Sequence, residues 1–388
     1  MSDVGGSSRL EAREYERLDD VGPDRLEALD GGLDFSFGLL RAIERSLWGD
    51  LLVRYLTIET GGQAMAFTPV YVGSNLNFNA LLPRAIQRGY DAMVRWLGTA
   101  AATRVAVVGS LISDRGWIPM HPALADRQEA VRRLLAEIDR VAREHDAHLC
   151  MLKDIHRDFP AEERALMRQA GYTEGWSLPT IRVDTGYASF DEYLSRHLSK
   201  NGRKHARKQF RKAQGRFSLR VVADFEHLVP RIYPLHRAVY LRAKYQFEEL
   251  PPRFFVECAR STRPQTELVV CETPDGRIAG SLLVFYDERE QLDKRIGIDY
   301  GLADSGLIYN LLNYTGLQRA IERGLSTVWL GQSTYLPKTR IGGGLEDQYL
   351  LLKAYKPALK PTLPLQRWWM GRYSRESIQT GLEQGVSI

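Results

Sequence analysis

The residues best suited to chemistry lie in one short segment, Arg196–Arg216, which reads RHLSKNGRKHARKQFRKAQGR. Between residues 200 and 216 it carries eight Lys or Arg side chains, one His and no acid. The formal net charge of the whole chain is only +5, so this segment alone exceeds it. A cluster of this density attracts phosphate, whether on RNA, a phospholipid, a nucleotide-linked substrate or the phosphopantetheine arm of a carrier.

The spacing of these charges predicts a helix with one basic face. Ala206, Phe210 and Ala213 supply a thin apolar side on which such a helix can dock. A charged helix face is commonly only solvated, but this segment contains no acid that could pair internally with the cations, and like charges four residues apart repel each other. The unpaired row therefore favours a ligand. We assign donor or phosphate binding to Arg203, Lys204, Arg207, Lys208, Arg211 and Lys212.

A second candidate set lies downstream. His236, Tyr240 and Lys244 are spaced by four residues, so they share one face of a predicted helix at 228–245. They are suited to line the cleft for an acceptor, and equally to form the rim of an amphipathic helix. No Ser/His/Asp or Cys/His set can be assembled from spacing, so direct attack on a bound donor is expected rather than a covalent nucleophile.

Length and composition indicate a globular chain that is long enough for two ordinary domains or one large one. It has 388 residues, of which 44% are hydrophobic and 26% charged. The pI near 9.0 favours local rather than whole-surface binding of nucleic acid. Three widely spaced cysteines suggest buried hydrophobes in a reducing compartment, and no metal site is expected. The polar N-terminus lacks signal-peptide features and no run approaches about 20 apolar residues, so we expect a cytoplasmic protein without a membrane span.

The elements that must position these residues form two α/β series around the basic helix. In the second series, strands at 267–272 and 278–286 make a hairpin through the turn TPDGR. A strand at 291–298, a helix at 307–323 and strands at 327–331 and 348–354 follow. The expected fold is α/β with mixed, mostly antiparallel sheets. The expected division is a polar tail 1–30, a first domain 31–186, a basic linker helix 187–216, a second domain 217–370 and a C-terminal tail 371–388.

The order of the second series matches the core of the GNAT acyltransferase fold, in which neighbouring strands splay apart to admit the acyl donor. A helix ending AIERGL, a strand ending LG and then PKTRIGGG resemble the Fem-like branch of that superfamily. The preceding SFDEYLSRHLSKNGRKHARKQFRKAQ resembles the same branch. The resemblance covers roughly residues 120–355. It implies two GNAT-like domains and an enzyme that forms an amide from an activated acyl donor and an amine.

The resemblance also implies roles for residues near the C-terminal end of this region. Lys338 matches a Fem-like lysine near the reacting carbonyl, where a cation stabilises the tetrahedral oxyanion. Pro337 stands where the family pattern has an aromatic residue. Arg340, Gly342 and Gly343 are assigned to the donor, although a solvated loop explains them as well.

Other assignments concern the strand before the long helix. Asp299 is placed to deprotonate the attacking ammonium and Tyr300 to orient a substrate or protonate the leaving group, although Asp299 also suits a turn. Tyr309 and Gln332 are assigned to the acceptor cleft. The usual GNAT pyrophosphate loop is replaced by Asp304-Ser305-Gly306, which argues against an ordinary acetyl-CoA enzyme.

Three functions follow, in order of preference. The first is aminoacyl transfer from aminoacyl-tRNA to an amine-bearing small molecule or precursor, with the basic helix on tRNA and no permanently bound cofactor. The second keeps the fold and takes acyl-CoA or an acyl-carrier protein as donor. The third is a non-catalytic protein that binds nucleic acid or a membrane surface.

Overall fold

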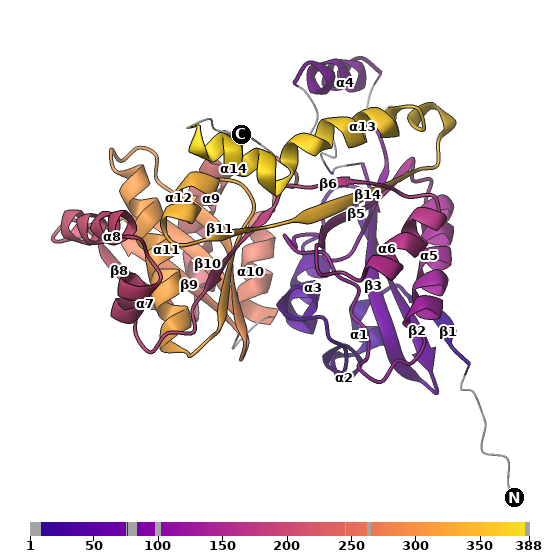
Figure 1. Cartoon of the computed structure of the whole chain (residues 1–388), viewed down its shortest axis with the longest axis horizontal. Coiled ribbons are helices and arrows are strands. Elements are labelled where there is room, and N and C mark those ends of the chain that lie inside the picture. Colours follow the sequence, from indigo (N-terminus) through magenta and orange to yellow (C-terminus); the bar gives the residue numbers. More distant parts are fainter. Residues whose placement is uncertain are drawn as a thin grey trace, which may run out of the picture. The chain divides into compact units, whose positions relative to one another are not determined.

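Two seven-stranded mixed sheets form the framework of the chain (Figure 1). The computed structural model describes residues 9–74, 76, 84–97, 102–244, 246–261 and 265–384. The chain divides into two units, of which unit 1 comprises Met1–Ser177 with Gln348–Arg372. Unit 2 comprises Leu178–Asp347 with Tyr373–Ile388.

The sheet of unit 1 has the order β1-β2-β3-β4-β5-β14-β6. Only β4 and β5 run parallel, and every other neighbouring pair is antiparallel. The strands are β1 (Glu11–Tyr15), β2 (Leu52–Thr60), β3 (Gln63–Gly73), β4 (Val105–Val108), β5 (Leu149–His156), β6 (Thr173–Trp176) and β14 (Gln348–Ala354). The helices are α1 (Leu18–Val21), α2 (Pro23–Glu27), α3 (Phe37–Arg45), α4 (Arg84–Leu97), α5 (Arg127–Glu144), α6 (Ala161–Gln169) and α13 (Thr362–Met370).

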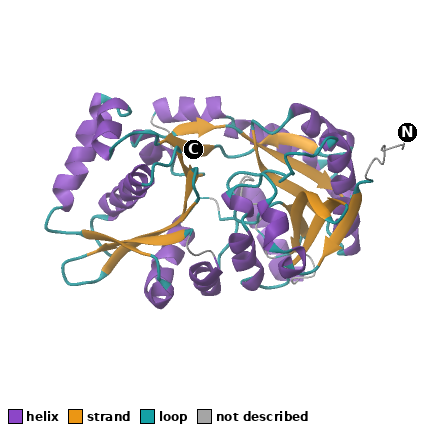
Figure 2. Cartoon of the chain, turned by 90° about the horizontal axis from the view of Figure 1, so that it is seen from below, coloured by secondary structure: helices purple, strands orange, loops and turns teal. Residues whose placement is uncertain are grey.

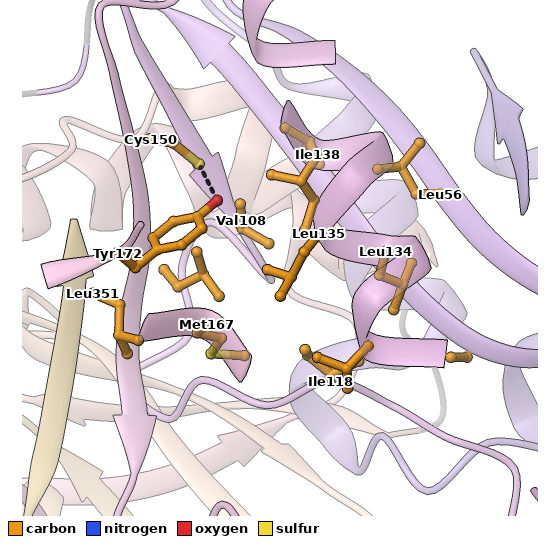
Figure 3. Packing of buried hydrophobic residues seen from close by; sticks show 14 of the residues in the cluster. Leu56, Val108, Ile118, Leu134, Leu135, Ile138, Cys150, Met167, Tyr172 and Leu351 are labelled. Atoms are coloured by element: carbon orange, nitrogen blue, oxygen red, sulfur yellow. Dashed lines mark hydrogen bonds between the residues drawn. The ribbon is translucent and has the colours of Figure 1, made fainter. Parts of the chain in front are cut away.

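The core of unit 1 lies between its sheet and helix α5. Asp126 caps that helix by accepting a hydrogen bond from the Glu129 amide at 2.9 Å. The helix then buries an apolar stripe against β-sheet side chains (Figure 3). Within the same core the Tyr172 hydroxyl donates to Cys150 Sγ at 3.3 Å. All three cysteines are buried and free, as their spacing predicts.

The sheet of unit 2 has the order β13-β7-β12-β11-β10-β9-β8, and again only one pair, β11 and β12, is parallel. The strands are β7 (Thr180–Asp184), β8 (Ser218–Val222), β9 (Thr266–Glu272), β10 (Ile278–Tyr286), β11 (Glu290–Ile298), β12 (Thr327–Gly331) and β13 (Gly344–Glu346). The helices are α7 (Phe190–Arg196), α8 (Lys200–Ala213), α9 (Val229–Arg242), α10 (Pro252–Ser261), α11 (Ser305–Glu322), α12 (Tyr335–Arg340) and α14 (Arg375–Glu383).

Helices cover both faces of the second sheet. A Cβ at Gly280 in β10 would lie 2.6 Å from Ile308 of α11, so that helix packs closely on one face. A Cβ at Gly297 in β11 would lie 2.9 Å from the backbone of His236 in α9. Gly297 precedes the residue that pairs with Gly280, so it points to the other face. The sheet therefore lies between α11 and α9. Figure 2 shows the helices and strands of the chain from a second direction.

Each sheet takes one strand from a distant part of the chain. Strand β14 lies between β5 and β6 of unit 1, and β7 lies between β12 and β13 of unit 2. The structural division thus differs from the expected domains 31–186 and 217–370, because β7 belongs to unit 2 and β14 to unit 1. Local sequence patterns specify a strand but not its distant partner.

The expected tails and linker also contain regular structure. The predicted tail at 1–30 holds β1, α1 and α2, and the tail at 371–388 holds α14. The predicted linker at 187–216 is two helices, α7 and α8. Strands β12 and β14 have the predicted bounds, and the turn between β9 and β10 places Gly276 at φ 80°.

Candidate functional site

Lys338 is buried at the end of strand β12. Its ammonium group donates hydrogen bonds to the carbonyl oxygens of Gln332, at 2.8 Å, and Gly331, at 3.3 Å. The segment predicted to be a loop instead forms helix α12, which Tyr335 anchors by donating to the Pro179 carbonyl at 2.9 Å. The short helix holds the Lys338 ammonium group beneath the surface, at the end of a central strand.

A sharp backbone turn between β12 and α12 makes this placement possible. Gly331, Ser333 and Thr334 have φ values of 70°, 60° and 52°. Glycine adopts such values readily, but each of the other two costs about 1–2 kcal/mol. Strained non-glycine residues are concentrated at functional sites, which makes this turn a place to look for one.

Asp293 is another buried charged residue of unit 2, and the sequence analysis did not identify it. It follows the last parallel pair of β11 and β12, Leu292 with Trp329. Its Oδ1 accepts a hydrogen bond from Gln291 Nε2 at 2.8 Å, while Oδ2 is buried without a hydrogen-bond partner. A Cβ at Gly316 would lie 2.5 Å from Oδ2, so only glycine lets α11 approach this carboxyl group.

The electrostatics of this site set the protonation of Asp293 near neutral pH. Burial raises the pKa of Asp293 to about 7, with a further upward contribution from Glu267. The hydrogen bond from Gln291 and the positive charge of Lys338 limit that rise. A carboxyl group with this pKa, within electrostatic range of an ammonium group, has the properties of a general base beside an oxyanion-stabilising cation.

A polar network holds the Asp293 side chain in place. Gln291 also donates to the Gly316 carbonyl at 2.9 Å and accepts from Arg323 Nη1 at 3.3 Å. Arg323 in turn forms an ion pair with Glu267. Buried polar groups that are bonded in this way are rigid, so the direction of the Asp293 carboxyl group is fixed.

Tyr309, predicted to belong to the acceptor cleft, lies on α11 two turns before Gly316. Burial raises the pKa of Tyr309, and the nearby Asp293 and Tyr300 contribute to the rise. Its hydroxyl group therefore lies within electrostatic range of both residues. The unpredicted Asp293 thus lies within electrostatic range of both Lys338 and Tyr309.

Asp299 and Tyr300 are each engaged by an arginine side chain. Asp299 forms an ion pair with Arg277 and accepts a hydrogen bond from the Gly301 amide at 2.9 Å, which is the turn role left open above. It lies six residues beyond Asp293, or about 20 Å along an extended strand. The Tyr300 ring is covered by the Arg242 guanidinium group at 4.1 Å.

The basic helix α8 presents most of its charge to solvent. Arg203 differs from the rest, because it donates to the carbonyl oxygens of Ser195 and Leu198, at 2.9 and 2.7 Å, and so caps α7. Ala206 and Ala213 are buried, and the Phe210 ring contacts Tyr314 of α11 at 5.5 Å. Within the described part of the chain, six exposed cations of this helix have no hydrogen-bond or ion-pair partner: Lys200, Lys204, Arg207, Lys208, Arg211 and Lys212.

The first turns of α8 lie directly against the segment that carries Lys338. A Cβ at Gly202 would lie 3.4 Å from the Arg340 carbonyl oxygen. Burial is the main cause of the lowered pKa of His205, and the charge of Arg340 is the next. Arg340 is itself exposed. The row of cations and the buried Lys338 therefore lie on adjacent elements of one unit.

Gly342 and Gly343 pack against neighbouring elements. His197 Nε2 lies 2.9 Å from the Gly342 carbonyl oxygen, and a Cβ at Gly342 would lie 2.5 Å from the same ring. A Cβ at Gly343 would lie within contact of Ile181 in β7. The structure thus gives these glycines a close-packing role against α7 and β7.

The remaining predicted acceptor residues are dispersed. The His236 ring packs against Phe255 at 4.8 Å, and burial together with Arg295 lowers the pKa of His236 to about 3, so the imidazole is neutral at physiological pH. Tyr240 is half-buried on the same helix, but α9 ends at Arg242 and Lys244 lies beyond it. Gln332 donates to the Leu178 carbonyl at 2.9 Å.

The equivalent place in unit 1 is closed by the protein itself. Parallel pairing of β4 and β5 ends at Val108 and Leu152. The loop that follows β4 then forms a bridge from Gly116 to Ile155, and the Gly116 amide donates to the Asp154 carbonyl at 2.6 Å. The loop after β4 thus fills the space between the two strands. The candidate site therefore belongs to unit 2.

Sequence reasoning missed Asp293 because it lies inside a predicted strand. A signal was present, since EQLDKRIGI places Gln291, Asp293 and Lys294 within a strand whose position in the centre of a domain predicts apolar side chains. Over the described residues, no cluster of three or more His, Cys, Asp or Glu side chains could hold a metal ion.

Comparison with known proteins agrees with the resemblance seen in the sequence. The model of the FemAB-like family, described as peptidoglycan biosynthesis/recognition, matches residues 116–333, which is more than half of the chain. No curated protein matches the sequence.

Solved structures resemble the fold at low sequence identity. FemX aligns with a TM-score of 0.60 at 10% identity, covering 90% of this chain and 100% of FemX. The C-terminal domain of a putative lysylphosphatidylglycerol synthetase from Agrobacterium fabrum aligns with a TM-score of 0.52 at 14% identity, covering 91% and 96%. A tandem GNAT protein from the clavulanic acid pathway aligns with a TM-score of 0.51 at 13% identity, covering 90% and 99%. The predicted fold of two GNAT-like sheets is confirmed.

Proposed function

This chain belongs to the FemAB-like family and is an acyltransferase of GNAT fold, and we propose that it transfers an aminoacyl group from aminoacyl-tRNA to an amine. The observation that carries this proposal is the contact between α8 and the segment holding Lys338. That contact sets a row of unpaired cations beside the segment that holds the buried ammonium group, which lies within electrostatic range of the buried Asp293 carboxyl group. The donor places the reaction in the cytoplasm, where aminoacyl-tRNA is made.

The length of the cationic row favours a nucleic acid over a single phosphate group. Helix α8 has 14 residues and is therefore about 21 Å long. Six exposed cations along that length match several phosphates of an RNA strand. The pyrophosphate of CoA, or the phosphate of a carrier arm, would use only a small part of the row.

The start of α11 also argues against a CoA thioester. A GNAT pyrophosphate is expected between the strand and helix that correspond to β11 and α11. Here the N-cap of α11 is Asp304, which forms an ion pair with Arg216, and Asp299 lies in the same connection. Carboxylates at a helix N-terminus compete with and repel a bound phosphate. This feature supports tRNA over acyl-CoA as the donor.

In the proposed reaction, Asp293 and Lys338 each act in one step. Asp293 takes a proton from the ammonium form of the acceptor, and the free amine attacks the ester carbonyl of aminoacyl-tRNA. Lys338 stabilises the negative charge on the tetrahedral oxygen. The amide bond forms as the ester bond to the terminal ribose breaks. The proton that the attacking nitrogen then loses passes to the departing ribose oxygen, and we assign its relay to Tyr309. The family description makes an amine of a peptidoglycan precursor the first acceptor to test.

A transfer assay tests the proposal. Purified protein is mixed with tRNA charged with a radiolabelled set of amino acids and with a panel of amine acceptors, and the amide product is detected by chromatography and mass spectrometry. We expect product with intact aminoacyl-tRNA and none after the tRNA is digested with RNase before mixing. Parallel reactions contain acyl-CoA and acyl-carrier protein. Product that forms from a thioester and survives RNase would overturn the tRNA assignment.

A further inference from the structure

Helix α4 is an insertion that the fold of unit 1 does not require. It lies in the connection between the antiparallel neighbours β3 and β4, which occupies residues 74–104. The connection in the same position of unit 2, between β10 and β11, occupies only residues 287–289. Figure 1 shows α4 standing away from the sheet of unit 1. An element that a short turn can replace needs another reason to exist.

The side chains of α4 separate into an apolar and a basic side. Ile86, Met93 and Trp96 fall on one side of the helix, and they are 46%, 39% and 84% exposed. Arg88 and Arg95 fall on the opposite side and are also exposed. A helix that offers a tryptophan and other apolar groups to water on one side, and arginines on the other, has the pattern of an interfacial helix.

A second element of unit 1 has the same character. On α13, Leu365 is 57% and Trp368 is 74% exposed. Residues 348–375 contain no Asp or Glu, whereas they include exposed cations on and around α13. These exposed cations are Lys356, Lys360, Arg367 and Arg372.

We propose that unit 1 binds the surface of an anionic phospholipid membrane through α4 and α13. Tryptophan side chains prefer the headgroup region of a bilayer, where Trp96 and Trp368 would insert. Basic side chains near such a surface are attracted to anionic lipids, which gives the charge complementarity. Among the described residues no helix is long and apolar enough to span a bilayer, so the attachment proposed is peripheral. The inference is independent of the donor and acceptor in the proposed reaction.

Vesicle sedimentation tests the membrane proposal directly. The full chain is incubated with vesicles of phosphatidylcholine alone and of phosphatidylcholine with phosphatidylglycerol. We expect binding to the anionic vesicles and a fall of about tenfold in the partition coefficient for Met93→Glu/Trp96→Glu, and likewise for Leu365→Glu/Trp368→Glu. Leu241→Glu is the matched control, because Leu241 is 52% exposed on α9 of unit 2. Circular dichroism of each variant confirms that it is folded.

A second measurement separates insertion from simple charge attraction, to which α8 also contributes. Vesicles with brominated acyl chains should quench tryptophan fluorescence, and Trp96→Phe/Trp368→Phe should remove most of that quenching. Equal binding by wild type and both Glu double variants would overturn the proposal. Light scattering that shows a dimer of the wild type, dissociated by the same variants, would assign the surface to a second copy instead.

Discussion

The Asp293 carboxyl group is the residue on which the proposed chemistry most depends. Since burial raises the pKa of Asp293 to about 7, the group is largely protonated at pH 6 and largely ionised at pH 8. A general base must be ionised, so the transfer rate should rise with pH through about 7 in the wild type. Asp293→Asn keeps the shape and should lose at least about a hundredfold in kcat together with this rise. Asp299→Asn is the control and should keep the rise of the transfer rate with pH. If that rise is lost in Asp299→Asn, the general base is Asp299.

The same carboxyl group makes a prediction about stability. The unfolded chain releases the Asp293 proton near pH 4, but the folded protein retains it until about pH 7. The folded state therefore binds more protons across this window, and its stability falls as pH rises through it. Asp293→Asn should melt at a higher temperature than the wild type at pH 8, with a smaller difference at pH 5. Thermal melts followed by circular dichroism at both pH values measure this. If the melting temperatures of Asp293→Asn and wild type differ equally at pH 5 and pH 8, ionisation of Asp293 does not destabilise the folded protein.

Lys338 is tested by removing its charge while keeping its length. Lys338→Met leaves the carbonyl oxygens of Gly331 and Gln332 without their ammonium donor and leaves the tetrahedral oxygen without its cation. We expect a fall in kcat of about 10²–10³-fold, with a smaller change in KM. Because a buried lysine also has a structural role, Lys338→Met is compared with Lys338→Arg, which keeps the positive charge. If Lys338→Arg is as stable as the wild type but its kcat stays low, the result supports a catalytic role for Lys338. A full kcat in Lys338→Met would remove Lys338 from the mechanism.

The sequence was sufficient to find Lys338 but not Asp293. Lys338 stands in a motif that resembles the Fem-like pattern, whereas Asp293 has no motif and is defined by a distant glycine, Gly316, that leaves room for it. The proximity of these residues arises from β11, α11 and α12 packing together. Spacing along the chain does not contain that information.

At the scale of the element, helix α8 has a role that salt dependence can measure. If its cations neutralise tRNA phosphates, the logarithm of the affinity falls linearly with the logarithm of the salt concentration. Lys208→Glu/Lys212→Glu should reduce that slope by about 2 and weaken aminoacyl-tRNA binding at low salt. Lys356→Glu/Lys360→Glu makes the same charge change on unit 1 and is the matched control. If both double variants weaken aminoacyl-tRNA binding equally, α8 contributes only through the net positive charge of the protein and is not a specific binding site.

The elements found from sequence are those with strong local signals. Strands β12 and β14 are short apolar runs bounded by glycine or polar residues, and both have the predicted bounds. Helix α12 was missed because it is only six residues long and contains Pro337, so no helical period can be recognised. Strand β13 is three residues long and is defined by its pairing with β7.

At the scale of the whole molecule, the two sheets are linked by an exchange of strands. In each sheet the strand between the parallel pair and the edge comes from a distant stretch, β14 in unit 1 and β7 in unit 2. The same strand order in both sheets indicates two copies of one fold. Each sheet is completed by one strand from the other half of the chain. Sequence patterns predicted the two copies, but the exchange depends on pairing across about 200 residues for β14 and about 145 for β7, which no local pattern encodes.

This exchange predicts how the chain can be divided. A fragment 1–186, cut at the boundary expected from sequence, lacks β14 and therefore leaves β5 and β6 without the strand that pairs with both. It should be aggregated or only partly folded, because each exposed strand edge carries unpaired backbone groups. Residues 1–177 joined by a Gly-Ser linker to 348–372 restore the strand and should give a cooperative thermal transition. Circular dichroism and amide hydrogen exchange distinguish the two. A cooperative fold in the shorter fragment would show that β14 is dispensable to unit 1, whereas failure of the joined fragment would show that unit 1 needs unit 2 to fold.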